Sequence, residues 1–492
     1  MHVISMNDFG PNNPLESVLA EAEKMLPWAK RNTCDKQFPN HKVVILMMER
    51  STRTGGSTEQ GAMNLGMRHT MISGVDHTSV LKGESFADTF RMFVGQGARI
   101  LALRTKIEGA PLFAAKVCQE YVEKISIINP GPVSIINCGD GEHFHPTQTC
   151  LDTGTIKLNL DRLDNFRLGI MGDPSKGRTA HSLFQEFSKR PGMKLVIVAP
   201  KGFEMPTSYK QGVKNVIESD SLEALAECDI VYVTRFQMER MTEEERRYIE
   251  SVRRNYVITK KVLDSWNPEV RIMHPLPRVD EIAPEISLDE RVIAFQQAEY
   301  GIPTRMAIMA MLCERPYIPY ALPSEPKRLL AEKDESRIDK KKLVKYFQPV
   351  DCGTVVDHIP AGETDQLLKV LKTLRGLKKE LPRQFVQYVK TAKYSNRKKD
   401  VLLFHGYQLP DFAAATIQAL FPKVTINYLS GGNIIVKKRF RVPVAISKNT
   451  HCSNENCITN HDREAKPNFI FREIGDGAHN VICEYCDTPL WS

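Results

Sequence analysis

Apolar residues follow two spacings along the first 312 residues of the chain. Between residues 14 and 30 they recur every three or four positions, which predicts an amphipathic helix carrying Leu15, Val18, Leu19, Ala22 and Leu26. Short runs rich in β-branched residues then alternate with helical stretches, and this alternation predicts an α/β fold of doubly wound parallel sheets. The runs expected to form strands are residues 43–48, 100–103, 133–136, 168–171, 195–199, 230–233 and 257–258.

The same pattern predicts where the chain divides. We expect two parallel-sheet domains at 1–148 and 149–299, bridged by a helix within 147–160, and a helix at 300–313 that packs back on the first domain. Residues 314–342 hold closely spaced prolines followed by a charged stretch, which is typical of a linker.

Beyond this linker the elements become shorter. Strands are predicted at 354–356, 400–404, 424–428 and 433–436, and helices at 364–374 and 413–420. Because these strands lack regular crossover units, residues 343–440 are expected to form an α+β domain with an antiparallel sheet. Residues 441–492 have few apolar runs, so we expect a small β domain in which a bound metal replaces a large core.

The composition narrows the classes of protein. With 42% hydrophobic and 26% charged residues over 492 positions, the chain is typical of a globular protein with several domains. No apolar run approaches the roughly 20 residues that cross a bilayer, and the N-terminus lacks a secretion signal. We therefore expect a cytoplasmic protein without a membrane partner. The net charge of +8 is partly used in anion-binding clusters, so we expect no nucleic-acid partner.

Four of the 11 cysteines have the spacing of metal ligands. Cys452 and Cys457 form a C-x4-C pair, and Cys483 and Cys486 form a C-x2-C pair. This set predicts one closed, tetrahedral Zn²⁺ site of structural type per chain. Two disulfides are the alternative, but they need an oxidising compartment that nothing else in the sequence indicates.

Polar and cationic residues directly follow several of the predicted strands. Ser51, Thr52, Arg53 and Thr54 come after the run 43–48 and before a helical stretch, so hydroxyls, a guanidinium and free amides converge there. Alone, this cluster is explained equally well by a helix N-cap. The construction recurs, however, at 145–148, at Arg178, at 234–237 and at 274–278. Together these segments predict a pocket for small, multiply charged anions.

These motifs carry a resemblance to a known family. Ser-Thr-Arg-Thr, Lys-Gly-Glu, His-Pro-Thr-Gln, Gly-Arg-Thr, Thr-Arg-Phe-Gln and His-Pro-Leu-Pro-Arg stand in the order found in catalytic chains of aspartate carbamoyltransferases. The part after the linker resembles that enzyme's regulatory chain. The resemblance implies the carbamoyltransferase fold, with a carbamoyl phosphate-binding domain at 1–148, an aspartate-binding domain at 149–299, a nucleotide-binding-type domain at 343–440 and a zinc-binding domain at 441–492.

For carbamoyl phosphate, the resemblance implies that Ser51 to Thr54 bind the phosphate group. Thr54, Arg104 and His145 would donate hydrogen bonds to the carbonyl oxygen and stabilise the oxyanion. Gln148 would position the carbamoyl nitrogen. The catalytic set is thus Arg53, Thr54, Arg104, His145 and Gln148, and the backbone carbonyls of Pro275 and Leu276 would accept from substrate NH groups.

For aspartate, the resemblance implies that Arg178 holds one carboxylate while Arg235 and Gln237 hold the other, with Leu276 beside them. A planar guanidinium suits a carboxylate, and Arg178 stands where a nucleotide P-loop would need lysine. Lys82 and a hydroxyl from Thr78 or Ser79 would enter the site of a neighbouring subunit, which implies a homotrimer or a dimer of trimers. Ornithine carbamoyltransferases typically carry cysteine where this chain has Pro275, which favours aspartate.

In the regulatory part, residues 353–360 match the family's nucleotide-binding strand, so Asp357, His358 and Lys437 are candidate contacts. Two departures count against effectors such as ATP, CTP and UTP: Leu403 replaces a second lysine, and Gly432 replaces an aromatic residue. A lost charge-assisted contact weakens binding by roughly 1.5 to 3 kcal/mol, so we predict weak or absent nucleotide binding.

The resulting hypothesis is an enzyme, an aspartate carbamoyltransferase of pyrimidine (UMP) biosynthesis. The amine of L-aspartate would attack carbamoyl phosphate and release phosphate, without an active-site metal or organic cofactor. Two alternatives stay open from the sequence: a non-catalytic scaffold that keeps the fold, and a carbamoyltransferase that acts on another amine.

Overall fold

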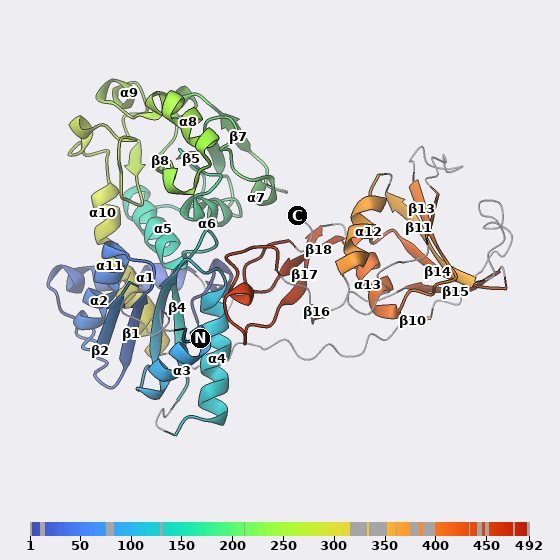
Figure 1. Cartoon of the computed structure of the whole chain (residues 1–492). Helices are drawn as coiled ribbons and strands as arrows, with labels where there is room; N and C mark the ends of the chain where they lie inside the picture. Colours follow the sequence, from blue (N-terminus) through green and yellow to red (C-terminus); the bar gives the residue numbers. More distant parts are fainter. Residues whose placement is uncertain are drawn as a thin grey trace. The chain divides into compact units, whose positions relative to one another are not determined.

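The computed structural model describes residues 2–9, 15–74, 83–127, 131–210, 212–314, 332–333, 352–360, 362–373, 383–386, 399–431, 433–439, 445–447, 452–475 and 478–489. The chain forms two compact units, Met1–Tyr320 and Ala321–Ser492 (Figure 1). Within the described residues, no helix is both long enough and apolar enough to cross a membrane.

The first unit begins with a parallel four-stranded sheet in the order β2-β1-β3-β4. Its strands are β1 (Lys42–Met47), β2 (Arg68–Ser73), β3 (Ile100–Thr105) and β4 (Ser134–Asp140). Helices lie on both faces (Figure 1): α1 (Leu15–Lys30), α2 (Thr52–Asn64), α3 (Phe86–Gly95) and α4 (Ala110–Lys124). Because both faces are covered, the central strands are apolar without alternation, as Val43 to Met47 show.

A second parallel sheet follows in the order β7-β6-β5-β8-β9. Its strands are β5 (Arg167–Met171), β6 (Lys194–Val198), β7 (Val216–Ser219), β8 (Ile230–Val233) and β9 (Arg271–Met273). Its helices are α6 (Arg178–Phe187), α7 (Thr207–Lys210), α8 (Glu243–Val252) and α9 (Lys260–Asp264). The predicted fold class, paired doubly wound parallel sheets, is confirmed.

Three further helices run between the two sheets or alongside them. Helix α5 (Pro146–Leu160) leads from β4 to β5, and α10 (Ala294–Glu299) precedes α11 (Gly301–Glu314). Helix α11 packs on α1 and α2 of the first sheet and also contacts α5. It is apolar on all sides and almost wholly buried, from Gly301 to Met311.

One predicted strand is wrong. Val257 and Ile258 form no strand of the sheet; Ile258 makes only an isolated bridge to Ile282, and β9 supplies the fifth strand. The run is apolar because Ile258 is buried in the core, not because it pairs in the sheet. The prediction also missed β2 and β7, whose residues are mostly only partly buried or exposed because both strands lie at sheet edges.

The second unit holds an antiparallel sheet in the order β10-β15-β14-β11-β13-β12. Its strands are β10 (Glu332–Lys333), β11 (Cys352–Pro360), β12 (Arg383–Val386), β13 (Lys399–His405), β14 (Thr425–Ser430) and β15 (Asn433–Arg439). Helices α12 (Thr364–Thr373) and α13 (Asp411–Leu420) share its core. Strands β16 (Ala445–Ser447), β17 (Asn468–Gly475) and β18 (Ala478–Cys483) form a smaller sheet. Strand β10 lies within the predicted linker 314–342, most of which is outside the described residues.

Candidate active site

The candidate site is built from loops that leave the carboxyl ends of the parallel strands. Strands β1, β3, β4, β5, β8 and β9 all lead into these loops, and such ends are where open α/β sheets bind ligands. Ser51 caps α2 by accepting from the Thr54 amide at 3.4 Å, so the free amides of the first turn face the same space. The local sequence thus places an anion-binding helix start directly after a buried strand.

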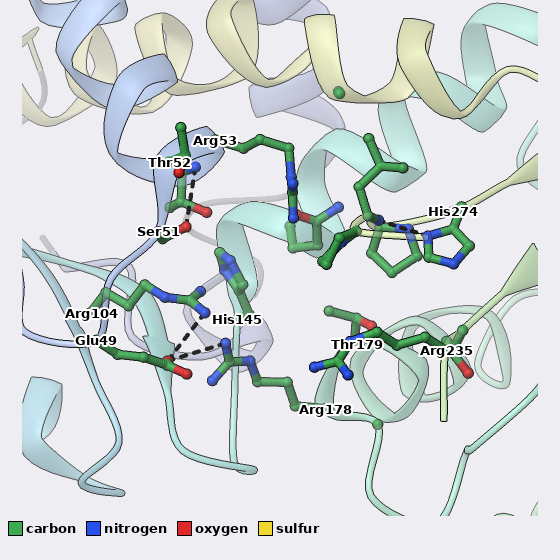
Figure 2. A pocket seen from close by; sticks show the side chains of 18 of the residues that line it. Glu49, Ser51, Thr52, Arg53, Arg104, His145, Arg178, Thr179, Arg235 and His274 are labelled. Atoms are coloured by element: carbon green, nitrogen blue, oxygen red, sulfur yellow. Dashed lines mark hydrogen bonds and ion pairs between the residues drawn. The ribbon is translucent and has the colours of Figure 1, made fainter. Parts of the chain in front are cut away.

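These loops line a cavity of about 420 Å³ (Figure 2). The structure brings every predicted substrate contact that it describes into the cavity wall: Ser51, Thr52, Arg53, Thr54, Arg104, His145, Gln148, Arg178, Arg235, Gln237, Pro275 and Leu276. Lys82, Thr78 and Ser79 lie outside the described residues.

The cavity wall is strongly cationic. Seven arginines line it against two glutamates, and the arginines are Arg50, Arg53, Arg104, Arg178, Arg235, Arg240 and Arg305. Sequence reasoning missed Glu49, Arg50, Arg240 and Arg305. Glu49 and Arg50 could have been predicted, because they stand between a predicted strand and Ser51.

Glu49 joins loops of the two sheets. Its Oε2 lies 3.1 Å from Arg104 Nη2 and 3.6 Å from Arg178 Nη2, as the dashed lines of Figure 2 show. Burial lowers the pKa of both arginines, that of Arg178 to about 10, so both stay charged at neutral pH. Gly139, with a φ of +121°, lies beneath them, since a Cβ there would stand 3.0 Å from Arg104 and 3.1 Å from Arg178. A side chain at this position would displace the guanidinium groups.

His145 is buried at the start of α5 and is held in the neutral form. Burial and the surrounding arginines lower its pKa well below the ordinary value. Thr147 Oγ1 lies 3.4 Å from its Nδ1, and Arg305 donates from Nη2 to the same hydroxyl at 3.3 Å. A guanidinium can only donate, so the hydroxyl oxygen accepts from Arg305, and the hydroxyl can still donate to Nδ1 or accept from it. In the tautomer that carries its proton on Nε2, Nδ1 accepts from this hydroxyl.

The loops after β5 and β8 are tied together. Gln237 donates from Nε2 to the Lys176 carbonyl at 2.8 Å, and Lys176 pairs with Glu245 at 2.8 Å. Arg235 is bound in a bidentate ion pair by Glu239. This pair is half exposed, so a carboxylate ligand can compete for the guanidinium.

The loop after β9 takes a specific shape. Leu276 has a φ of +56°, and its amide donates to His274 Nδ1 at 2.8 Å, while the Leu276–Pro277 bond is cis. A leucine in the left-handed region is uncommon and is found chiefly where the surroundings impose it. Pro275 and Leu276 line the cavity from this loop.

A second site lies in the other unit. Cys452, Cys457, Cys483 and Cys486 are buried, and their four Sγ atoms lie within 4.8 Å of one another. The separations are 3.5 Å for Cys452 to Cys486 and 3.7 Å for Cys457 to Cys483. A tetrahedral ion with Zn–S bonds of about 2.3 Å separates its sulfurs by about 3.8 Å, so the cluster fits a structural metal.

The candidate nucleotide contacts lie on the antiparallel sheet of the second unit. His358 and Asp357 pair with each other on β11, at 3.2 Å. Lys437 is on β15, and β14 lies between the two strands. Leu403, where the resemblance led us to expect lysine, is fully buried on β13.

Four family models match the chain in succession. The carbamoyl-P binding domain of aspartate/ornithine carbamoyltransferase matches residues 1–158, and the Asp/Orn binding domain matches 164–312. The allosteric domain of the aspartate carbamoyltransferase regulatory chain matches 346–441, and its metal binding domain matches 445–491.

Solved structures resemble the first unit. The catalytic subunit of M. jannaschii aspartate transcarbamoylase has a TM-score of 0.55 and 35% identity, covering 64% of this chain and 98% of that one. Trypanosoma cruzi aspartate transcarbamoylase, in complex with carbamoyl phosphate and aspartate, has a TM-score of 0.55 and 26% identity, covering 63% and 94%.

Relatives match both the first part and nearly the whole chain. The aspartate carbamoyltransferase catalytic subunit of Methanothrix thermoacetophila is 37% identical over 64% of this chain and 98% of its own length. Protein PyrBI of Thermotoga maritima is 30% identical over 92% of this chain and 90% of its own length. The chain therefore belongs to the aspartate carbamoyltransferase family and joins catalytic-chain and regulatory-chain domains in one polypeptide.

Proposed function

We propose that the cavity of the first unit transfers the carbamoyl group of carbamoyl phosphate to the α-amine of L-aspartate, giving N-carbamoyl-L-aspartate and phosphate for pyrimidine synthesis. The observation that carries this proposal is the convergence of seven arginines, His145 and the α2 N-terminus on one cavity. Both substrates are multiply charged anions, and a similar solved structure holds both of them.

The phosphate group binds at the start of α2. Thr52, Arg53 and Thr54 present amides, hydroxyls and a guanidinium there, and the partial positive charge of a helix N-terminus adds to the attraction. Bidentate contacts from Arg53 give the phosphate a defined orientation.

The carbonyl oxygen of carbamoyl phosphate faces three donors, which are Thr54, Arg104 and His145. Neutral His145 donates through Nε2 in the tautomer whose Nδ1 accepts from the Thr147 hydroxyl. As the amine attacks, negative charge builds on this oxygen, and donors already fixed in place stabilise it.

Aspartate binds on the opposite wall. Arg178 takes one carboxylate, and Arg235 with Gln237 takes the other, while the carbonyls of Pro275 and Leu276 accept from substrate NH groups. A carbon–nitrogen bond forms, the carbon–oxygen bond to phosphate breaks, and the departing phosphate takes the amine proton. Positioning and charge stabilisation account for the rate, so no covalent intermediate is needed.

Lys82 and either Thr78 or Ser79 complete the site from a neighbouring subunit. A partner loop at the cavity would add a cation and a hydroxyl. We also assign Zn²⁺ to the four cysteines, since four thiolates at tetrahedral spacing match a closed zinc site.

A steady-state assay tests the function. The full-length protein should form N-carbamoyl-L-aspartate from carbamoyl phosphate and aspartate, and should form far less product with ornithine. No product from a folded, metal-loaded protein would support a scaffold instead, and a preference for ornithine would mean that the wrong amine was assigned.

A further inference from the structure

A fully buried carboxylate lies one helical turn behind Gln148. Asp152, on α5, accepts from Gln148 Nε2 at 2.9 Å and from Gln297 Nε2 at 2.6 Å, both on Oδ1. Its Oδ2 accepts from the Tyr232 hydroxyl at 2.7 Å. Asp152 itself is not part of the cavity wall, whereas both glutamines are.

The contact with Asp152 fixes the orientation of the Gln148 amide. A carboxylate accepts only, so it selects the NH₂ end of that amide. The Gln148 Oε1 is then left for another donor, and the carbamoyl NH₂ of the substrate is a donor. An amide turned the other way would bring its oxygen against the carboxylate and lose this contact.

The other two contacts reach the aspartate side of the cavity. Gln297 accepts at Oε1 from the His274 amide at 2.8 Å, which fixes the start of the 274–278 loop. Tyr232 belongs to β8, three residues before Arg235. The Asp152 side chain thus connects α5, α10 and β8. Each of these elements brings a residue to the cavity wall: Gln148 lies on α5, Gln297 lies on α10, and Arg235 follows β8.

We propose that Asp152 is a positioning residue for carbamoyl transfer, which orients the Gln148 amide and joins it to the aspartate-binding loops. This inference rests on the proposed function of the cavity. It gives a role to a buried acid that does not line the cavity.

Both charge states of Asp152 keep the contact with Gln148. The ionised carboxylate accepts from all three partners, and a protonated one still accepts from both glutamines at Oδ1 while its Oδ2–H donates to the Tyr232 oxygen. Burial raises the pKa of Asp152 to about 7, although the three hydrogen bonds and the charge of Arg305 on α11 act to lower it. The orientation of the Gln148 amide therefore does not depend on the ionisation of Asp152.

A double-mutant cycle tests the positioning role. Asp152→Ala should lower kcat at least about 10-fold in the parent, and by clearly less in a Gln148→Ala background, because part of its effect passes through Gln148. The parent must first convert carbamoyl phosphate and aspartate; if it does not, the proposed function fails. The parent could instead be active while the kcat loss in the double variant equals the product of the two single-variant losses within about twofold. In that case the positioning role of Asp152 is wrong and the proposed function still stands.

Asp152→Asn is the matched variant that keeps the shape. Its Oδ1 can still accept from both glutamines, and its Nδ2 can donate to the Tyr232 oxygen. We expect it to keep most of the turnover of the parent, because both glutamine contacts remain. Its stability relative to the parent should rise with pH between about 4 and 7, because the raised pKa of Asp152 costs the parent stability as the acid ionises.

Two results would overturn the proposal. One is a folded Asp152→Ala protein with the turnover of the parent. The other is an Asp152→Asn protein that loses as much turnover as Asp152→Ala. If Asp152→Ala does not fold, Tyr232→Phe decides instead: it removes one of the three contacts and should lower kcat, and the turnover of the parent in this variant would overturn the proposal.

Discussion

At the scale of single residues, the cavity combines buried positive charge with few compensating acids. Arg104 and Arg178 share one carboxylate, Glu49, and burial lowers the pKa of both arginines. Among the described residues, seven arginines line the cavity wall against two glutamates, and such an excess of buried positive charge is costly in a low-dielectric site. Anionic substrates supply the missing charge, so binding should stabilise the protein as well as fill the cavity.

The two aspartate-binding arginines should not tolerate replacement. We expect Arg178→Ala and Arg235→Ala to lower kcat/KM for aspartate by at least about 100-fold, because each removes a bidentate contact with a carboxylate. Arg235→Lys should recover only part of the loss. In the Arg235→Ala protein, calorimetry should still detect carbamoyl phosphate at nearly the parent affinity, and parent-like aspartate kinetics in either alanine variant would contradict the assignment.

The tautomer of His145 can be tested through Thr147. Thr147→Val removes the hydroxyl that links Arg305 to Nδ1, while Thr147→Ser keeps it. We expect kcat to fall about 10- to 100-fold in the valine variant and much less in the serine variant, because one oxyanion donor loses its orientation. Nitrogen-15 NMR of the histidines should show Nε2–H for His145 in the parent. Nδ1–H there would disprove the proposed orientation.

At the scale of elements, the buried apolar strands could be predicted, and the polar edge strands β2 and β7 could not. Val43 to Met47 are buried on both faces of the sheet, so their continuous apolar run predicts a central strand. Strand β2 reads Arg-His-Thr-Met-Ile-Ser and exposes polar side chains at a sheet edge, so neither an apolar run nor a regular alternation reveals it. Val257 and Ile258 gave the opposite error, a predicted strand that the structure does not contain. Apolar residues also occur where a loop enters the core, as Ile258 does.

The four-cysteine cluster should hold the last domain together. Cys483 ends β18, and its partners Cys452 and Cys457 come from the segment before β17, so one ion joins segments with little apolar core of their own. We expect Cys483→Ser to lower the bound Zn²⁺ from about one per chain to nearly none and to make residues 445–489 sensitive to protease. The exposed Cys352 gives the control, since Cys352→Ser should leave metal content unchanged. Full metal content in Cys483→Ser would exclude it as a ligand.

At the scale of the whole molecule, the chain carries one catalytic part for every regulatory part. Fusion fixes this ratio, but each active site still depends on assembly if Lys82 comes from a neighbour.

Mixing inactive variants tests the shared site. We expect Lys82→Ala and His145→Ala proteins to be nearly inactive alone. When they are dissociated and reassembled together, activity should return, because some sites then receive His145 from one chain and Lys82 from another. The mass of the assembly in solution should be that of a trimer or of paired trimers. No recovery in mixed assemblies of this mass would show that each site is complete within one chain.

Nucleotides should have little effect on the aspartate saturation curve. With Leu403 buried where a lysine contact was expected, we predict that ATP, CTP and UTP shift half-saturation by less than about twofold, because a charge-assisted contact worth roughly 1.5 to 3 kcal/mol is missing. Saturation kinetics with each nucleotide, supported by calorimetry, measure this. A shift of several-fold together with measurable binding would show that the regulatory domain is functional.

From the sequence alone followed the class of fold and the four clustered cysteines, because strand patterns and cysteine spacing are local properties. Twelve residues of the cavity wall also followed from the sequence, through the resemblance of its motifs to a known family. The tertiary structure decided the contacts that orient these residues: Glu49 with Arg178, Arg305 with Thr147, and Asp152 with Tyr232 and Gln297. These partners lie 80 or more residues apart along the chain, so no local pattern connects them until the two sheets pack around α5.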